Sequence, residues 1–152
     1  MPDPSDDAVF LAALAAVPDA RWDELSQALH ALDGATTFAA WSGGQVETRE
    51  VDGEAREVTH MPYPDYVPEV ERLREAIGRC GLIVPYDWMA WDGIERYRGG
   101  AGMADAPPAD AVRLITAIIR SERFGDGNLE GALQSGTLQA AVGRLLTLRA
   151  AD

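Results

Sequence analysis

ADAVRLITAIIRSERF, residues 109–124, is the most regular stretch of this sequence and the one that most decides its fold. Its apolar side chains recur at three- and four-residue spacing, which predicts a helix with a buried face. The residues expected to point inward are Leu114, Ile115, Ile118 and Ile119. Arg113 and Arg120 are seven residues apart and therefore share a face, and Arg123 lies one turn beyond Arg120. We therefore expect an apolar helix that also carries a set of arginines.

Helices are predicted on both sides of this stretch. Downstream, a short helix ends near Gln134, and a final helix starts near Thr137. Upstream, a strong helix runs from Pro68 to about Cys80, where Gly81 is well placed to end it. Residues 5–16 and 19–32 form two further helices, so that the chain begins with a helical hairpin over residues 1–34.

Between the helical regions the pattern changes to that of short strands. Residues 35–41 are rich in threonine and aromatics, residues 45–51 alternate, and Asp52-Gly53 is a hairpin signal. The MPYPDYVP segment (61–68) contains three prolines and is expected to be an extended arm lying on the surface. We predict an α+β protein with one mainly helical domain over residues 1–152. Its expected parts are the N-terminal hairpin (1–34), a β insert (35–62) with a small antiparallel hairpin or sheet at about 35–60, and a helical core (63–152).

Composition excludes several classes of protein. The hydrophobic fraction of 47% and charged fraction of 25% are those of a globular chain. No apolar run approaches the ~18 residues that span a membrane, and the acidic N-terminus does not resemble a signal peptide. The net charge is −12, and residues 1–60 hold twelve acidic residues against three arginines, so we expect no nucleic-acid binding. Cys80 is the one cysteine, which fits a reducing compartment and a cytoplasmic protein.

No catalytic or metal-binding signature is present. His30 and His60 are thirty residues apart, and neither has a second ligand nearby, so we expect no metal and no cofactor. The fragment from Asp126 to Gly131 resembles half of a calcium loop but has Thr137 where the bidentate glutamate should stand. A turn in which Asn128 caps the next helix is the better interpretation. Cys80 lies on a buried helix face, and no serine occupies a nucleophile elbow.

One stretch, VPYDWMAWDG (84–93), is rich in both aromatic and acidic residues. Together with the arginine set it supplies the candidate site residues, which are Asp87, Trp88, Trp91, Asp92, Arg120 and Arg123. If the last helices pack on this stretch, an arginine paired with Asp87 or Asp92 would hold the fold together and require no ligand. The alternative is an anion pocket with free arginines and aromatic walls. The partner of Asp87 distinguishes the two.

The same residues resemble a known family. MPYPDY, a helix, V-P-Y-D-W-x-x-W, then R-x-x-R-F-x-x-G-x-L and later G-x-L and R-L are similar to a bacterial domain-of-unknown-function family, number six-five-zero-eight, over about residues 38–147. The residues that carry the resemblance are Tyr63, Tyr66, Asp87, Trp88, Trp91, Arg120, Arg123, Phe124, Leu129, Gly136 and Leu138. Glu122 stands where aspartate is expected, and Val67 where a capping serine is typical. The resemblance implies a bounded domain and no assigned activity, cofactor or catalytic residue.

These observations favour a small, non-catalytic binding or interaction protein of the bacterial cytoplasm. Its partner would be another protein or a second copy of the chain. Two alternatives remain open. One is a small enzyme or ligand-binding protein that uses the aromatic, acidic and arginine residues as a pocket. The other is an acidic inhibitor that mimics nucleic acid.

Overall fold

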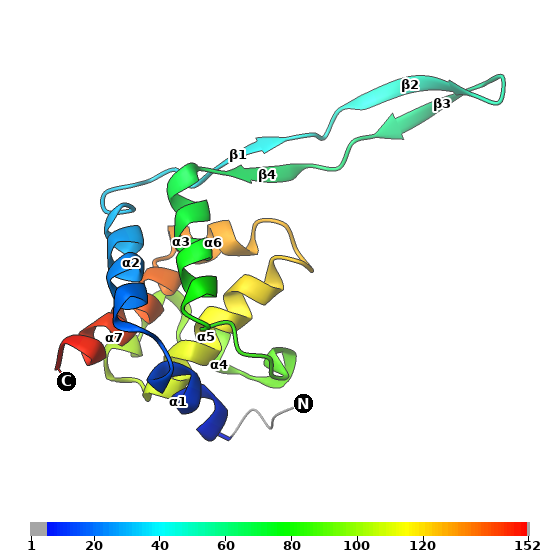
Figure 1. Ribbon diagram of the computed structural model, residues 1–152. Coiled ribbons are helices and arrows are strands. Elements are labelled where there is room, and N and C mark those ends of the chain that lie inside the picture. Colours follow the sequence, from blue (N-terminus) through cyan, green and yellow to red (C-terminus); the bar gives the residue numbers. More distant parts are fainter. Residues whose placement is uncertain (1–5, 152) are drawn as a thin grey trace.

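The computed structural model describes residues 6–151 and shows a helical body from which a β arm projects (Figure 1). The helices are α1 (Ala8–Ala15), α2 (Asp19–His30), α3 (Pro68–Arg79), α4 (Gly93–Arg96), α5 (Pro108–Ser121), α6 (Asn128–Gln134) and α7 (Thr137–Ala151). Short 3-10 turns are η1 (Trp88–Ala90), η2 (Arg98–Gly100) and η3 (Met103–Asp105). The strands are β1 (Ala39–Ser42), β2 (Val46–Val51), β3 (Glu54–Thr59) and β4 (Tyr63–Tyr66). The predicted class, α+β and mainly helical, is confirmed.

Helix α5 is the centre of the helical body. It packs against α1, α4, α6 and α7, and every residue from Ala109 to Ile118 is buried. The predicted inward residues Leu114, Ile115 and Ile118 lie in the core, whereas Ile119 is half-buried. Because neighbours surround α5 on all sides over its first three turns, Arg113 is buried as well. The spacing of the apolar residues predicted one buried face and did not indicate that neighbouring elements would bury the helix on every side.

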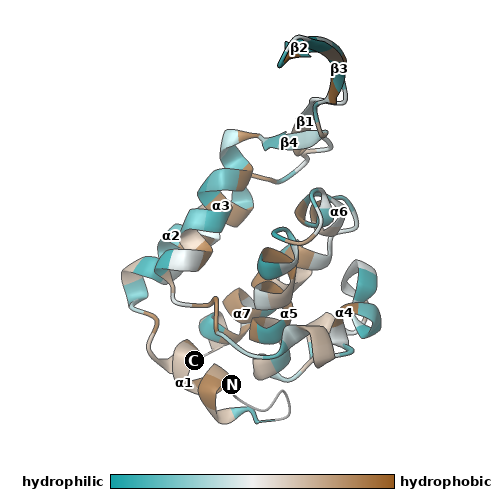
Figure 2. Ribbon diagram, turned by 90° about the vertical axis from the view of Figure 1, so that its right-hand side faces the viewer, coloured by the Kyte–Doolittle hydropathy of each residue, from teal (hydrophilic) through white to brown (hydrophobic). Residues whose placement is uncertain are grey.

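Helices α2 and α3 lie side by side along one flank of the body (Figures 1 and 2). Pro68 is the first residue of α3, where its missing N–H costs no hydrogen bond. At the other end Gly81 adopts φ +74°, and the amide of Leu82 donates to the carbonyl oxygen of Ile77, which closes the helix as the sequence predicted. The two helices expected at the N-terminus are present among the described residues, from Asp6 onward, but α1 packs mainly on α5, whereas α2 packs on α3 and α7. Residues 1–5 of the expected hairpin lie outside the described part.

The β region lies four residues further along the chain than predicted and forms a ribbon of two consecutive two-stranded sheets over residues 39–66, here called the β arm. Strand β1 pairs antiparallel with β4, and β2 pairs antiparallel with β3. The prediction placed residues 61–68 in an extended arm on the surface, but Tyr63–Tyr66 is a strand that pairs with β1. Pro64 is tolerated there because a two-stranded ribbon leaves one edge of each strand without a hydrogen-bonded neighbour.

Two tight backbone positions shape the arm. Asp52 (φ +52°) and Gly53 (φ +80°) form the two-residue loop between β2 and β3, as the Asp-Gly signal predicted. Gly43 (φ +90°) lies where the ribbon bends between its two strand pairs, and a Cβ there would overlap the carbonyl oxygen of Met61. Glycine at position 43 therefore allows the two strands to remain close through the bend.

Candidate functional site

The six candidate residues predicted from the sequence divide into separate environments. Asp92 is exposed, and its carboxylate pairs with Arg96 one helical turn away at 2.6 Å. Trp91 is half-buried and packs edge-on against Tyr86, with 6.3 Å between ring centroids. Trp91 also lies so close to Gly93 that a Cβ at that position would overlap its indole ring. Asp92 and Trp91 therefore stabilise the turn that leads into α4.

Arg113, which the sequence grouped with Arg120 and Arg123, lies instead in a buried ionic network. Its guanidinium binds Asp110 at 2.8 Å and Asp7 at 2.6 Å, and it lies over the ring of Phe10 at 4.4 Å. The hydroxyl of Tyr97 donates to the other oxygen of Asp110 at 2.5 Å, and burial together with this carboxylate raises the pKa of that phenol. Such a network holds α1 and α4 against α5.

Trp88, Arg120 and Arg123 are brought together at the C-terminal end of α5. Two open hollows flank the arginines, with volumes of about 290 and 320 Å³. Both arginines border both hollows, and Ile83, Ile119, Arg74, Glu122, Pro85, Tyr86, Trp88, Thr116 and Phe124 supply the remaining walls. We call this surface the arginine groove. Its most exposed wall is Phe124, which is 72% exposed and packs against Trp88 at 5.9 Å between centroids.

The arginine groove carries positive charge that the chain itself does not neutralise. Most of the arginines pair with a carboxylate, as Arg21, Arg79 and Arg149 do. Within residues 6–151, neither Arg120 nor Arg123 lies within ion-pairing distance of one. In a chain with a net charge of −12 this is unexpected. The two guanidinium charges give this surface a locally positive character.

Asp87 does not form the pair that the sequence suggested. It is exposed and lies at the start of η1, and among the described residues no arginine approaches its carboxylate within ion-pairing distance. The 84–93 stretch is held instead by apolar and backbone contacts. The hydroxyl of Tyr86 donates to the carbonyl oxygen of Arg113 at 2.8 Å, and the amide of Val84 donates to the hydroxyl of Thr116 at 3.0 Å.

Glu122 is a structural residue that the sequence did not single out as important. Its buried carboxylate accepts hydrogen bonds from the amides of Gly127 (3.1 Å) and Leu129 (2.7 Å) and from the hydroxyl of Tyr66 (2.6 Å). Glu122 thus performs the capping of α6 that was predicted for Asn128, whose side-chain amide instead donates to the carbonyl oxygen of Ser121. Glu122 also borders one hollow of the arginine groove, but its carboxylate oxygens already accept these three hydrogen bonds.

The contact between Glu122 and Tyr66 also anchors the β arm. Burial and the neighbouring Glu122 carboxylate raise the pKa of Tyr66, which favours the protonated hydroxyl that donates to Glu122. The indole nitrogen of Trp41 donates to Glu130 at 3.0 Å. Both anchoring side chains belong to the basal strand pair, β1 and β4. Tyr66 holds this pair to the turn before α6, and Trp41 holds it to the first turn of α6 itself.

Beyond this anchor the β arm stands clear of the body (Figures 1 and 2). No residue of β2 or β3 is buried. Five of the chain's exposed large apolar side chains lie on the arm, namely Trp41, Val46, Val51, Met61 and Tyr63. A two-stranded ribbon with few apolar contacts is marginally stable in water, and both of its outer edges lack backbone partners. The alternating pattern predicted strands here but could not show that they leave the body.

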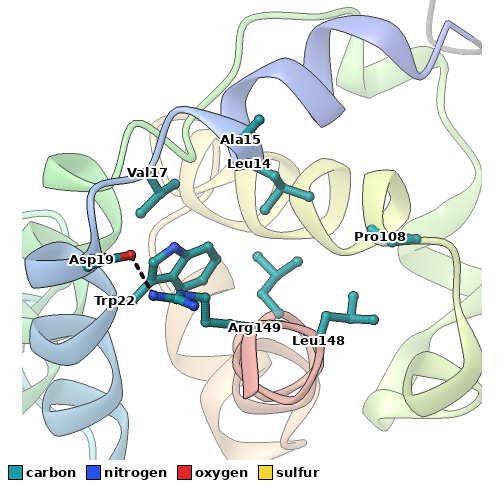
Figure 3. Close-up of a pocket in the computed structure, with 9 residues that line it drawn as sticks. Leu14, Ala15, Val17, Asp19, Trp22, Pro108, Leu148 and Arg149 are labelled. Atoms are coloured by element: carbon teal, nitrogen blue, oxygen red, sulfur yellow. Dashed lines mark hydrogen bonds and ion pairs between the residues drawn. The ribbon is translucent and has the colours of Figure 1, made fainter. Parts of the chain in front are cut away.

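A further cavity of about 430 Å³ lies between α1, α2 and the end of α7 (Figure 3). Apolar side chains line most of it, among them Leu14, Trp22 and Leu148. Its charged lining residues, Asp19 and Arg149, pair with each other at 2.5 Å. These two charges therefore already satisfy one another.

Neither a metal cluster nor an activated nucleophile is evident in the described part of the chain. No three metal-binding side chains gather within residues 6–151. His30 is exposed on the surface, and His60 lies on the arm beside Glu47. Burial raises the pKa of the Cys80 thiol to about 11, which keeps it protonated near neutral pH. None of the helices between residues 6 and 151 combines the length and the apolar character needed to cross a membrane.

The comparison with known families agrees with the residues described above. A family described as a family of unknown function, DUF6508, matches residues 17–151. The chain belongs to the DUF6508 family. No curated protein and no solved structure gives a significant match to it. The DUF6508 match covers α2 to α7 and the whole β arm, so the arm and the arginine groove both lie within the family's domain.

Proposed function

We propose that this DUF6508 protein is a small, non-catalytic interaction protein of the bacterial cytoplasm, and that the β arm is its principal binding surface. The observation that carries the proposal is the projection of β2 and β3 beyond the helical body with no buried residue. A ribbon of this kind gains stability when a protein partner covers its apolar side chains and extends its edges. Surface loops and arms that a rigid body positions are common sites of recognition.

The charge of the arm indicates what kind of partner it binds. Residues 39–66 contain six carboxylates and two arginines. Arms of this geometry that enter a nucleic-acid groove need positive charge to neutralise phosphates. An acidic ribbon repels both nucleic acid and anionic membranes, so the partner is a protein with a basic surface.

A site-specific photo-cross-linker tests this proposal in the cells that produce the protein. The probe replaces Thr48, which is exposed on β2. The matched control replaces Gln27, which is exposed on α2 and lies outside the arm. We expect a defined protein adduct, identified by mass spectrometry, from position 48 and none from position 27. Absence of an adduct at position 48, or equal adducts at both positions, would contradict the proposal.

Ligand binding in the arginine groove is the second candidate. Its support is that Arg120 and Arg123 lack a carboxylate partner in the described chain and stand beside the rings of Trp88 and Phe124. Calorimetric titration with inorganic phosphate and with an aromatic carboxylate tests it, with Arg120→Gln/Arg123→Gln as the control. The nucleic-acid mimic has less support, because Asp7 and Asp19 are already paired with arginines.

A further inference from the structure

We infer that the partner of the β arm is a second copy of this chain, and that the Glu50–Glu57 face of one arm binds the arginine groove of the other copy. This inference rests on the proposed function, because it names the partner of the same arm. The two surfaces that the inference joins, the face of the arm and the groove, each carry charges without an ionic partner within residues 6–151.

The two faces of the β2–β3 ribbon differ in charge. Side chains directly opposite one another in the register share a face, and Thr48 is opposite Glu57 while Glu50 is opposite Ala55. These four residues therefore form one face, which we call the acidic face. Within residues 6–151, neither of its carboxylates lies within ion-pairing distance of a cation.

The opposite face is neutralised within the ribbon. Arg49 pairs with Glu47, and Arg56 lies 3.9 Å from Glu54. Glu47 also binds the ring of His60, and both neighbours lower the pKa of the Glu47 carboxyl. This face consequently has no net attraction for a charged partner, whereas the acidic face has two unsatisfied charges at its centre.

The spacing of the two charged sets is compatible. Glu50 and Glu57 are diagonal neighbours on adjacent strands, which places their Cβ atoms roughly 7 Å apart. Arg120 lies in the last turn of α5, and Arg123 lies in the turn that follows, where its amide donates to the carbonyl oxygen of Arg120. For side chains three residues apart in a turn of this kind we expect a separation of roughly 5–6 Å, as on a helix. Long side chains on both partners absorb the small difference, so each carboxylate can meet one guanidinium.

The groove also offers apolar surface to match the ribbon. Phe124, which packs on Trp88 in the groove, is 72% exposed. Val46, at the base of β2, has its side chain on the same face as Glu50 and is 59% exposed. Packing of these apolar side chains around the ion pairs would exclude water and strengthen the charge interactions.

The arm does not satisfy its own groove, because it projects away from the body that carries the groove (Figure 1). Each copy supplies one acidic face and one arginine groove, so a two-fold pair uses both surfaces twice and closes. A second copy therefore neutralises four arginines with four carboxylates. The same contacts cover the ribbon that is exposed in the single chain.

A charge swap between two variants tests the inference. One variant carries Arg120→Glu and Arg123→Glu, and the other carries Glu50→Arg and Glu57→Arg. We expect the wild-type chain to form a dimer in sedimentation velocity, with an affinity that falls as salt rises. Each variant alone should dimerise at least about tenfold more weakly, because like charges then face each other. Mixed in equal amounts, the two variants should form a heterodimer, since both of its contacts again join opposite charges.

Two charge reversals outside the proposed contact serve as controls. Glu54→Arg on the neutral face and Arg21→Glu on α2 should leave the wild-type dimer unchanged. A monomeric wild-type chain, dimers that persist in both swapped variants, or a mixture that does not associate would each overturn the inference. Recovery of a different protein at the Thr48 cross-linker by a monomeric chain would overturn self-association while leaving the arm as a binding surface. No adduct at Thr48 would refute the proposed function itself.

Discussion

The contact between Tyr66 and Glu122 should prove to be the main attachment of the β arm to the helical body. Tyr66→Phe removes one hydroxyl that donates to a buried carboxylate at 2.6 Å. A hydrogen bond to a charged group contributes about 1.5–3 kcal/mol, so we expect the free energy of unfolding to fall by that amount. Tyr63→Phe is the matched control, since Tyr63 is exposed on the same strand, and it should change stability by less than about 0.5 kcal/mol.

Glu122→Ala should cost more than Tyr66→Phe, because it also leaves the amides of Gly127 and Leu129 without their acceptor. Two unsatisfied amides and the lost tyrosine contact give about 3–5 kcal/mol, allowing for partial access of water. The double variant should be more stable than the sum of the two losses predicts, with a coupling energy of about 1–2 kcal/mol. Urea unfolding followed by circular dichroism measures the stability of the wild-type chain and of all four variants. Additive losses, or a Tyr66→Phe effect no larger than that of Tyr63→Phe, would refute the anchoring role.

Three further predictions concern the bend, the thiol and the buried ion pair. Gly43→Ala should disrupt strand pairing at the bend, because residue 43 has a positive φ and the added Cβ would clash with the carbonyl oxygen of Met61. Hydrogen exchange of backbone amides should then accelerate in the arm and not in α5. Unchanged exchange in the arm would contradict this prediction. Burial raises the pKa of the Cys80 thiol from 9.0 to about 11. At pH 8 the thiol should therefore react with a thiol reagent far more slowly in the native chain than in the urea-unfolded chain, and equal rates would contradict this. The stability that comes from keeping the thiol neutral should be lost as the pH rises from 9 towards 11. Arg113→Ala should reduce the free energy of unfolding by about 3 kcal/mol, the low end of the range for breaking a buried pair, because it removes the closer cation of the buried Asp110 carboxylate and leaves Arg96 at 3.7 Å. A loss near zero in a urea titration would contradict a stabilising role of the pair.

The sequence was sufficient for local structure because local structure depends on short-range chemistry. The apolar spacing of residues 109–124 predicted α5, Gly81 predicted the end of α3, and Asp52-Gly53 predicted the hairpin turn. Each of these signals acts between residues a few positions apart. The prolines of residues 61–68 obscured β4, since proline lowers the expectation of a strand without forbidding one at an edge.

The candidate site could be predicted only in part. The sequence gathered Trp88, Arg120 and Arg123 into one candidate set, and the structure places them along one groove. It could not separate Arg113 from Arg120, because a seven-residue spacing puts both on one helix face, whereas only packing decides that one end of α5 is enclosed and the other is open.

Composition, helix positions and the hairpin turn were determined by the sequence alone, because they follow from the residues present and their nearest neighbours. The tertiary structure decided which charges are already satisfied. Glu122 turns inward to cap α6, Arg113 is enclosed by Asp110 and Asp7, and Arg120 and Arg123 are left facing solvent. Ion pairing depends on distances between atoms far apart in the chain, and those distances exist only after the helices have packed and the arm has been carried away from the body.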